Sequence, residues 1–458
     1  MIDHPMKKIT IRSASIISFS LCAASLSVAP TAMAQIIPWQ DNTPSALQPF
    51  DGNAAQAAKL VGSDIMIYSH APRAVSIPAK KGTLHYNNAQ FSTAAVVLSA
   101  KPEQVKQLLS QYSNYAGLFP TLTRATEIER KGNISQMKYH IHVPVPIPIL
   151  SFNEDVVMQH QLLDNSMQTL IIDSPIQYGM GKFEWYPIDN NRTLVTLTQW
   201  GDLDKPKGFL VSTILKALPE VKQGIPQSVD TFVLETLKRK FNPVGKLDTQ
   251  GPRQIPGKKL AANELALVQQ LNARSNQPVM FVHRPVNMPY SNRAEALQFV
   301  TTFATLKAPL AYSAQVLTTP AKYKEIFSQV SKVDSKLLPN QQGTDATITV
   351  KVGLGVIAIP FRLKLNYFNE GKNRYYYQAN GGDIEYMQGQ MQFNELPTTK
   401  SGQHTFLSMT SASKIGDNAP FLLKIGKSLP YAEVLPTVGG TPVFIYKTNQ
   451  YLVKHPQT

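Results

Sequence analysis

The residues able to do acid–base or metal chemistry are few and widely spaced. His140 and His142 are two positions apart, so a strand would place both imidazoles on one face, where they could ligate a metal ion. His160 is the only other histidine nearby, and the second half of the chain has Val352 and Leu354 at the corresponding places. We therefore interpret the pair as ordinary strand histidines and expect no metal site.

Three other motifs share part of a catalytic signature. Ser411-x-x-Lys414 has the spacing of a serine–lysine pair, but it falls in an expected strand and not at a helix start. Gly179-Met180-Gly181 lacks the remaining elements of a phosphate loop. Asn153-Glu154-Asp155 places adjacent carboxylates on opposite faces of a strand, which is poor geometry for a paired acid and base. We predict a protein that is not an enzyme and that uses no cofactor.

Residues 1–34 have the pattern of a cleavable signal peptide. Basic residues within 7–12 precede a short apolar core, and Ala32-Met33-Ala34 is a small-x-small cleavage site. The single cysteine, Cys22, lies in this segment, so the remaining chain has no disulfide and no thiol nucleophile. Export without disulfides indicates the bacterial periplasm, with cleavage after Ala34.

The net charge and its distribution limit the classes of binding partner that we expect. The chain has 45 Lys+Arg and 30 Asp+Glu, and without residues 1–34 it still carries a net charge of +13. The basic residues are scattered in short clusters, so we expect no nucleic acid, while contact with an anionic membrane surface stays open. No later segment has the roughly 20 apolar residues that a membrane-spanning helix needs.

An internal repeat with a period near 210 residues organises the chain. Its marks are an apolar run ending in His and Pro, a short helix, a Tyr-x-x-Gly strand and a Leu-Pro pair. Their positions in the two copies are 65–72 and 279–285, 105–111 and 323–329, 178–185 and 386–393, and 218–219 and 429–430. His70 and His283 belong to the first mark, and we expect each to form a structural hydrogen bond at a strand end, with proton transfer as the alternative.

Each copy has the order strand, short helix, several strands, long helix. We expect first strands at 91–100 and 310–318, because both are rich in β-forming residues. The five following strands are expected at 137–152, 156–163, 167–173, 181–187 and 193–200 in the first copy, and at 346–359, 361–368, 374–379, 387–396 and 404–413 in the second.

A long amphipathic helix is expected to close each copy. Apolar residues recur every three or four positions over 208–241, and Pro219 and Pro226 should break this helix into pieces. The second copy, 418–447, has more prolines and a Gly-Gly pair and should be more broken still.

Together these elements predict an α+β fold of two tandem helix-grip domains, each a curved antiparallel sheet on a long C-terminal helix. With the aromatic stretch 112–120 ending in Phe-Pro, each copy resembles the START-like (SRPBCC) superfamily, in particular its polyketide-cyclase-like and coenzyme Q-binding branches. The resemblance covers 91–242 well and 310–448 more loosely. It implies a cavity between sheet and helix for a lipid, quinone, sterol or polyketide.

The expected domains are a signal peptide (1–34), a first domain (35–242), a linker (243–263) and a second domain (264–458). In the second copy Val330 and Val333 align with Tyr112 and Tyr115, so its cavity is expected to be smaller, differently shaped or absent.

A curled sheet also supports a cavity on physical grounds, since one helix fills its concave side only if large side chains point inward. The alternative is a core packed by its own aromatic residues. In the first domain we expect a cavity lined by Tyr112, Tyr115, Phe119, Tyr178, Gly181, Trp185, Trp200, Ile214, Leu218, Val221, Ile225 and Phe232. In the second we expect Tyr386, Gly389, Phe393, Ile425 and Leu429.

The function expected from the sequence is binding or transfer of a hydrophobic small molecule in the periplasm. Two alternatives remain. One is an envelope interaction module without cargo, and the other is an enzyme of the cyclase or aromatase type.

Overall fold

The structure is a computed structural model of the chain. It describes residues 36–79, 82–143, 152–207, 218–290, 293–339, 343–354, 357–398, 402–416 and 430–457, with single positions between them. The expected signal peptide and the prolines of 144–148 lie outside the described residues.

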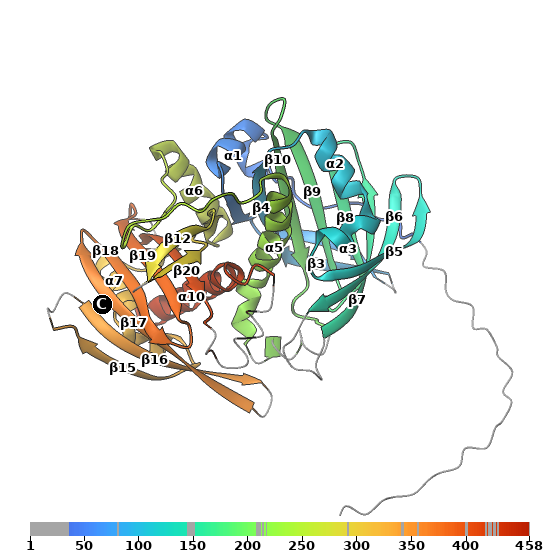
Figure 1. Ribbon diagram of the computed structural model, residues 1–458. Helices are drawn as coiled ribbons and strands as arrows, with labels where there is room; N and C mark the ends of the chain where they lie inside the picture. The colour runs from blue at the N-terminus through green and yellow to red at the C-terminus, as the bar shows by residue number, and fades with distance from the viewer. Residues whose placement is uncertain are drawn as a thin grey trace, which may run out of the picture. The chain divides into compact units, whose positions relative to one another are not determined.

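The same order of elements occurs twice (Figure 1). The first copy contains η1 (Gln48–Phe50), α1 (Ala54–Val61), β1 (Ile65–Ser69), β2 (Arg73–Pro78), β3 (Thr83–Ala89), β4 (Ser92–Leu98), α2 (Pro102–Ser110), η2 (Tyr112–Asn114), α3 (Tyr115–Leu118), β5 (Leu122–Lys131), β6 (Ile134–Val143), β7 (Phe152–Leu162), β8 (Ser166–Asp173), β9 (Gly179–Pro187), β10 (Thr193–Gly201), η3 (Pro219–Gln223) and α5 (Ile225–Phe241). The second contains α6 (Ala262–Ser275), β11 (Val279–Val282), β12 (Val286–Tyr290), β13 (Arg293–Leu297), β14 (Val300–Leu306), α7 (Leu310–Thr318), η4 (Pro320–Lys322), α8 (Tyr323–Ile326), β15 (Val330–Leu337), β16 (Gly343–Leu354), β17 (Ile357–Gly371), β18 (Arg374–Gly382), β19 (Tyr386–Glu395), β20 (Thr405–Lys414) and α10 (Leu435–Lys454).

Within the described residues, the main strands form one antiparallel sheet of 16, in the order β15-β16-β17-β18-β19-β20-β14-β11-β1-β4-β10-β9-β8-β7-β6-β5. The order on one side of the β1–β11 pair mirrors the order on the other. Met66 of β1 lies opposite Phe281 of β11, and both strands are buried along their whole length. Continuous apolar runs are typical of strands covered on both faces, which explains why these two strands occupy the centre.

One strand prediction is wrong and shifts the alignment of the copies. Leu310–Thr318 is the helix α7, because its buried residues, which include Ser313 and Leu317, recur at helical spacing after Pro309. The first strand of the second copy is β14, and β4 and β14 start 208 positions apart, as α2 and α7 do. Tyr112 and Tyr115 therefore correspond to Pro320 and Tyr323, and not to Val330 and Val333.

The edge strands β5 and β15 were not predicted from the sequence. Most of their residues are exposed or half-buried, so they lack the apolar alternation that identifies a strand. Each copy thus has six strands after the helices among the described residues, one more than expected.

Prolines interrupt the closing helix of the first copy but, in the described part of the chain, not that of the second. Pro219 opens the 3-10 helix η3, and α5 begins at Ile225 with Pro226 in its first turn. In the second copy α10 runs unbroken from Leu435 to Lys454, with Pro442 inside it. The expectation that this helix is more broken than the first is therefore wrong within the described residues, and the helix ends beyond the expected end at 447. The upstream parts of both expected helices lie largely outside the described residues.

Identical hydrogen bonds anchor both copies. The Tyr115 hydroxyl donates to the Leu109 carbonyl at 2.6 Å, and Tyr323 donates to the Leu317 carbonyl at 2.6 Å. Asn242 at the end of α5 accepts from the Ser99 amide and donates to the Val97 carbonyl. Asn449 of α10 accepts from the Lys307 amide and donates to the Thr305 carbonyl in the same way. These bonds fix which residues of the two long helices correspond.

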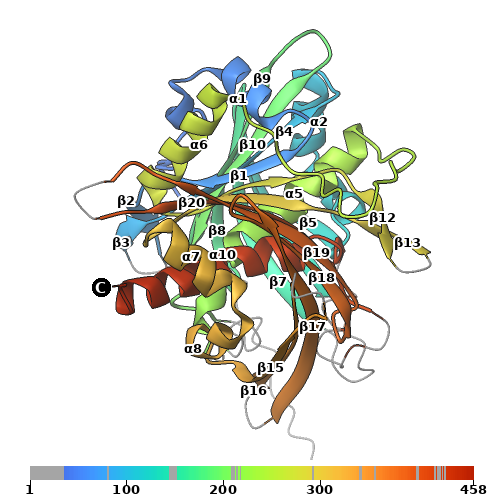
Figure 2. The ribbon, with the colours of Figure 1, turned by 90° about the vertical axis from the view of Figure 1, so that its left-hand side faces the viewer.

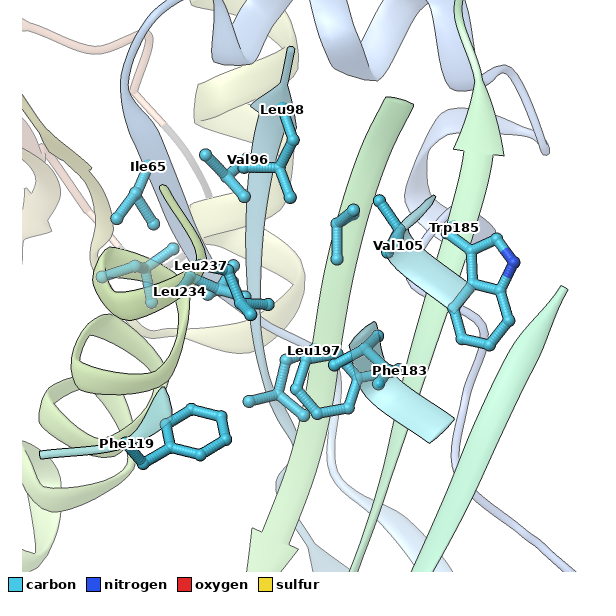
Figure 3. Packing of buried hydrophobic residues seen from close by; sticks show 14 of the residues in the cluster. Ile65, Val96, Leu98, Val105, Phe119, Phe183, Trp185, Leu197, Leu234 and Leu237 are labelled. Atoms are coloured by element: carbon cyan, nitrogen blue, oxygen red, sulfur yellow. The ribbon is translucent and has the colours of Figure 1, made fainter. Parts of the chain in front are cut away.

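In the first copy α5 packs on the sheet through Leu234 and Leu237, which point toward Val96 and Leu197 in Figure 3. Both leucines are fully buried. None of the described helices is both long and apolar enough to cross a membrane.

A buried carboxyl group on α5 makes the stability of the first copy depend on pH. Asp230 accepts hydrogen bonds from the Ser92 hydroxyl and, at 2.5 Å, from Gln199, and burial raises its pKa from 3.8 to about 7. The folded state therefore holds a proton that the unfolded chain releases, so stability should fall as pH rises from about 4 to about 7 and then level off. The full effect is on the order of 4 kcal/mol.

We predict that Asp230→Asn removes this pH dependence, because the amide keeps the shape of the carboxyl group and does not titrate. The measurement is urea unfolding at several pH values, with Asp164→Asn as the control because Asp164 is exposed. A slope between pH 4 and 7 that is equal in Asp230→Asn and the unaltered protein would contradict the prediction.

Candidate functional site

A cavity of about 720 Å³ lies in the second copy, between α10 and the strands β15–β20. Its walls are mainly apolar. The strands contribute Val330, Ile348, Val350, Phe361, Leu363, Leu365, Tyr367, Tyr377, Met387, Met391, Met409, Ser411, Ala412 and Ser413. The helix α10 and the segment around α8 contribute Pro436, Thr437, Gly439, Gly440, Thr441, Val443, Phe444, Tyr323, Phe327 and Gln329.

The first copy supplies one wall of this cavity. Leu218, Val221, Ile225 and Val229, from η3 and the start of α5, line it opposite the strands of the second copy. Gln329 donates to Glu220 at 2.6 Å and so links the two copies at the cavity edge. Figure 2 shows α5 passing close to α10.

The helices α5 and α10 approach closely because two glycines meet. A Cβ on Gly224 would lie 1.9 Å from the Gly439 carbonyl oxygen, and a Cβ on Gly439 would lie 2.6 Å from the Ser228 hydroxyl. Neither contact is compatible with a side chain unless the backbones move apart.

The polar groups in the cavity wall are largely satisfied by one another. Ser413 and Thr437 share a hydrogen bond of 3.0 Å, and the Thr441 hydroxyl donates to the Thr437 carbonyl at 2.7 Å. Burial raises the pKa of Tyr323 to about 12 and raises that of Tyr377 as well, so both phenols stay neutral. A wall of this kind offers a ligand apolar contact and few free hydrogen-bonding groups.

In the described part of the first copy, aromatic side chains of the core contact one another. Tyr112 stacks on His160 with ring centroids 4.7 Å apart, and Tyr115 stacks on Tyr139 at 5.8 Å. Phe119 contacts Phe232 of α5 at 6.5 Å. These rings belong to one buried cluster that also includes Trp185.

The residues at equivalent positions in the two copies differ in the size of their side chains. The asparagine anchors align Phe232 with Gly439, and the helices align Tyr112 with Pro320, so the second copy lacks two large rings. Asp230 aligns with Thr437, which replaces a buried carboxyl by a small hydroxyl. Gly439 and Thr437 both line the cavity.

The structure separates the residues expected to line one cavity in the first copy. Leu218, Val221 and Ile225 line the cavity of the second copy, while Tyr112, Tyr115, Phe119, Trp185 and Phe232 pack in the first. Tyr178 and Trp200 lie in the cluster on the opposite face of the sheet. Gly181 lies against Gln199, and a Cβ there would be 3.1 Å from the Gln199 Cβ. Ile214 lies outside the described residues.

The residues expected in the second copy divide similarly. Gly389 makes room for the Tyr377 ring, which a Cβ at that position would approach to 2.3 Å. Phe393 is buried in the core beside Tyr375, and Tyr386 packs against Tyr290 in the cluster on the other face of the sheet. Ile425 and Leu429 lie outside the described residues.

Several cavity residues were missed from the sequence, notably Met387, Met391 and Met409 on the strands and the stacked pair Phe327 and Phe444. The alternation Met387, Gly389, Met391 on one strand face was a usable signal. Phe444 was not identifiable in this way, because its contact with Phe327 depends on how α10 crosses the sheet.

The histidines form local hydrogen bonds. His140 bonds to Asp155 and His142 to Asn153 across neighbouring strands, and no cluster of metal-ligating side chains occurs among the described residues. His70 bonds to Thr93 at 2.8 Å and His283 to Thr301 at 2.7 Å. Burial lowers the pKa of His70 to about 4, so it is neutral at pH 7.

Comparison with known proteins finds matches among solved structures only, all at low sequence identity. No family model matches the chain, and no curated protein matches it in sequence. The di-domain ARO/CYC BexL of the BE-7585A biosynthetic pathway matches 80% of this chain and 99% of its own, at 13% identity and a TM-score of 0.25.

Two further structures match about a third of the chain. A START superfamily protein from Mycobacterium smegmatis covers 33% of this chain and 96% of its own, at 14% identity and a TM-score of 0.25. A STAR-related lipid transfer protein from Xanthomonas axonopodis covers 36% and 94%, at 12% identity and a TM-score of 0.24. Similarity at this level says nothing about ligand or activity, so we argue these from the chain's own residues.

We predict that Gly224→Ala lowers the free energy of unfolding by about 1–3 kcal/mol, because the methyl group forces α5 and α10 apart. The matched control is Gly440→Ala, since a Cβ at Gly440 meets nothing within 4 Å. Alanine is the better helix former, so the control should leave stability unchanged or raise it by up to about 1 kcal/mol. Chemical denaturation measures both, and equal effects of the two substitutions would contradict the close crossing of the helices.

Proposed function

We propose that the protein binds an apolar small molecule in the cavity of its second copy. The observation that carries this proposal is the 720 Å³ cavity, whose wall is apolar on the sheet, on α10 and on the segment from the first copy. Its volume lies in the range of about 300–1,000 Å³ that ligand pockets occupy. A lipid, a quinone or a sterol-like molecule has suitable chemistry.

The driving force is removal of apolar surface from water. At roughly 25 cal/mol per Å², a ligand that buries on the order of 400 Å² would gain about 10 kcal/mol before the cost of immobilisation. This gain depends on contact area and not on hydrogen bonds, which suits a wall whose hydroxyl groups are already paired.

We propose binding and not catalysis. The ionisable groups lining the cavity, among the described residues, are Glu220 and the three tyrosines Tyr323, Tyr367 and Tyr377. Burial raises the pKa of all three tyrosines, and Glu220 already accepts a hydrogen bond from Gln329 at the edge. General acid–base chemistry near pH 7 favours a group with a pKa close to 7, and burial moves the pKa of the three tyrosines further from that value.

In this proposal the second copy binds the ligand and the first copy supports it. The first copy, with its aromatic core, serves as a rigid scaffold that holds η3 and α5 over the second. The proposed location is the periplasm, where the basic chain could also contact an anionic membrane while it exchanges its ligand. The helix-grip arrangement of each copy is part of the same proposal.

We predict that Leu363→Trp weakens ligand binding by at least about tenfold, because the indole occupies space that the ligand would fill. Lys364→Trp is the matched control, since the neighbouring side chain of a strand points to the opposite face. Lys364 is exposed, whereas Leu363 lines the cavity. Binding is measured by titration with a fluorescent fatty acid and by mass spectrometry of organic extracts of the purified protein.

The two variants should differ in whether they retain a bound molecule. Extracts of the unaltered protein and of Lys364→Trp should contain a molecule that extracts of Leu363→Trp lack. Empty extracts from all three proteins, together with no binding of the fluorescent probe, would favour an interaction module without cargo and would overturn the proposal.

A further inference from the structure

A second, polar pocket of about 400 Å³ lies at the C-terminal end of α5. Its wall includes Arg192 from the turn before β10, Lys238 and Arg239 from α5, and Arg284 from the segment after β11. Glu235 of α5 is the only carboxylate among the described residues of the wall. Both copies contribute, because Arg284 follows the central strand of the second copy.

Two of the four cations are already neutralised by ion pairs. Arg192 bonds to Asp189 at 2.7 Å, and Arg239 bonds to Glu235 at 2.8 Å and to Glu433 at 2.6 Å. Among the described residues, Lys238 and Arg284 have no ion-pair partner. The pocket therefore contains positive charge that the protein itself does not balance.

Lys238 is a buried cation whose ammonium group has no hydrogen-bond acceptor among the described residues. The side chain is 7% exposed, and its Nζ has no hydrogen-bond partner among the described residues. The charges of Glu235 and Asp64 act on it without a direct hydrogen bond, and Asp64 is held by Lys258 at 2.9 Å and by His283 at 3.0 Å. A buried ammonium group without an acceptor is costly, and burial lowers the pKa of Lys238 as a result.

Glu235 has a buried carboxylate oxygen that lacks a hydrogen-bond donor among the residues that the structure describes. Its Oε1 accepts hydrogen bonds from Arg239 and Gln298, whereas its Oε2 is buried and accepts none within the described part of the chain. The wall of this pocket thus has a buried donor without an acceptor and a buried acceptor without a donor. A single ligand group that satisfies both must carry a hydrogen-bond acceptor for Lys238 and a donor for Glu235.

We propose that this pocket binds a hydrogen phosphate group, either free or as the phosphomonoester end of a larger molecule. The phosphate oxygens would accept hydrogen bonds from Lys238 and Arg284, and the phosphate O–H would donate to Glu235. Charge-assisted bonds of this kind are the strong ones in proteins, and the planar guanidinium group suits phosphate geometry. Sulfate is the informative comparison, because at neutral pH it has the same shape and no O–H.

The test is isothermal titration of the purified full-length mature chain with inorganic phosphate at pH 7, and in parallel with sulfate. We expect phosphate to bind and sulfate to bind at least about tenfold more weakly. Lys238→Met and Arg284→Gln should each weaken phosphate binding by about tenfold or more, since each removes a charge-assisted hydrogen bond. Lys240→Met, an exposed position on the same helix, should change nothing.

The two substitutions also separate folding from binding. Lys238→Met removes a buried unpaired charge and should fold, and Arg284 is exposed, so its replacement leaves the core intact. A loss of binding that appears in both variants and not in Lys240→Met would support the site. Unchanged binding in both, equal binding of phosphate and sulfate, or an equal loss in Lys240→Met would overturn it.

A second arm identifies the source of the phosphate. Vesicles of phosphatidylcholine with phosphatidic acid present a phosphomonoester at a membrane surface, and vesicles of phosphatidylcholine alone do not. Sedimentation with the first kind only, lost in Lys238→Met and Arg284→Gln, would assign the pocket to a lipid headgroup. Binding of free phosphate without vesicle binding would assign it to a soluble phosphate, and the absence of both would refute the proposal.

Discussion

The pairing of β1 with β11 determines how the rest of the molecule is arranged. Each strand is a short apolar run buried on both faces, and Met66 lies opposite Phe281 at the centre of the continuous sheet. A shift of one residue would move every side chain to the packing site on the other face. Because both faces are apolar, the fit of individual side chains into a close-packed core holds this register, and not an alternating pattern. Through this pair the two copies share core clusters and do not pack as separate bodies.

That arrangement brings α5 of the first copy against α10 of the second, where Gly224 and Gly439 meet. Gly439 takes the place that Phe232 has in the first copy. The same substitution thus removes a ring from the core and permits the close crossing of the helices. Duplication followed by the loss of a few large side chains is a simple physical route from a packed unit to a hollow one.

Much of the fold could be predicted from the sequence, because apolar periodicity and the repeat are properties of the chain itself. The antiparallel α+β architecture, the tandem copies and the breaks at Pro219 and Pro226 follow from such patterns. The error at 310–318 arose because Val316 and Leu317 suit a strand as well as a helix, and burial at helical spacing decided between them. The edge strands were missed because exposed residues have little pattern.

The site was harder to predict, for reasons that local sequence does not contain. Leu218, Val221 and Ile225 line a cavity, but it lies in the other copy, because the continuous sheet determines which helix faces which strands. Tyr178 and Trp200 lie on the far face of the sheet, since strand residues alternate and the sequence did not reveal which face is concave. The unpaired Lys238 and Glu235 could not be identified before the burial of α5 was known.

The central claim is that apolar cargo occupies the second copy and not the first. The most direct measurement is a crystal structure of the protein with a brominated long-chain fatty acid, in which the anomalous signal locates the bromine. We expect the bromine between α10 and the strands near Met391 and Met409, under the segment of the first copy that contains Val221. Bromine within the aromatic cluster of the first copy, or no bound bromine at saturating ligand, would contradict the account.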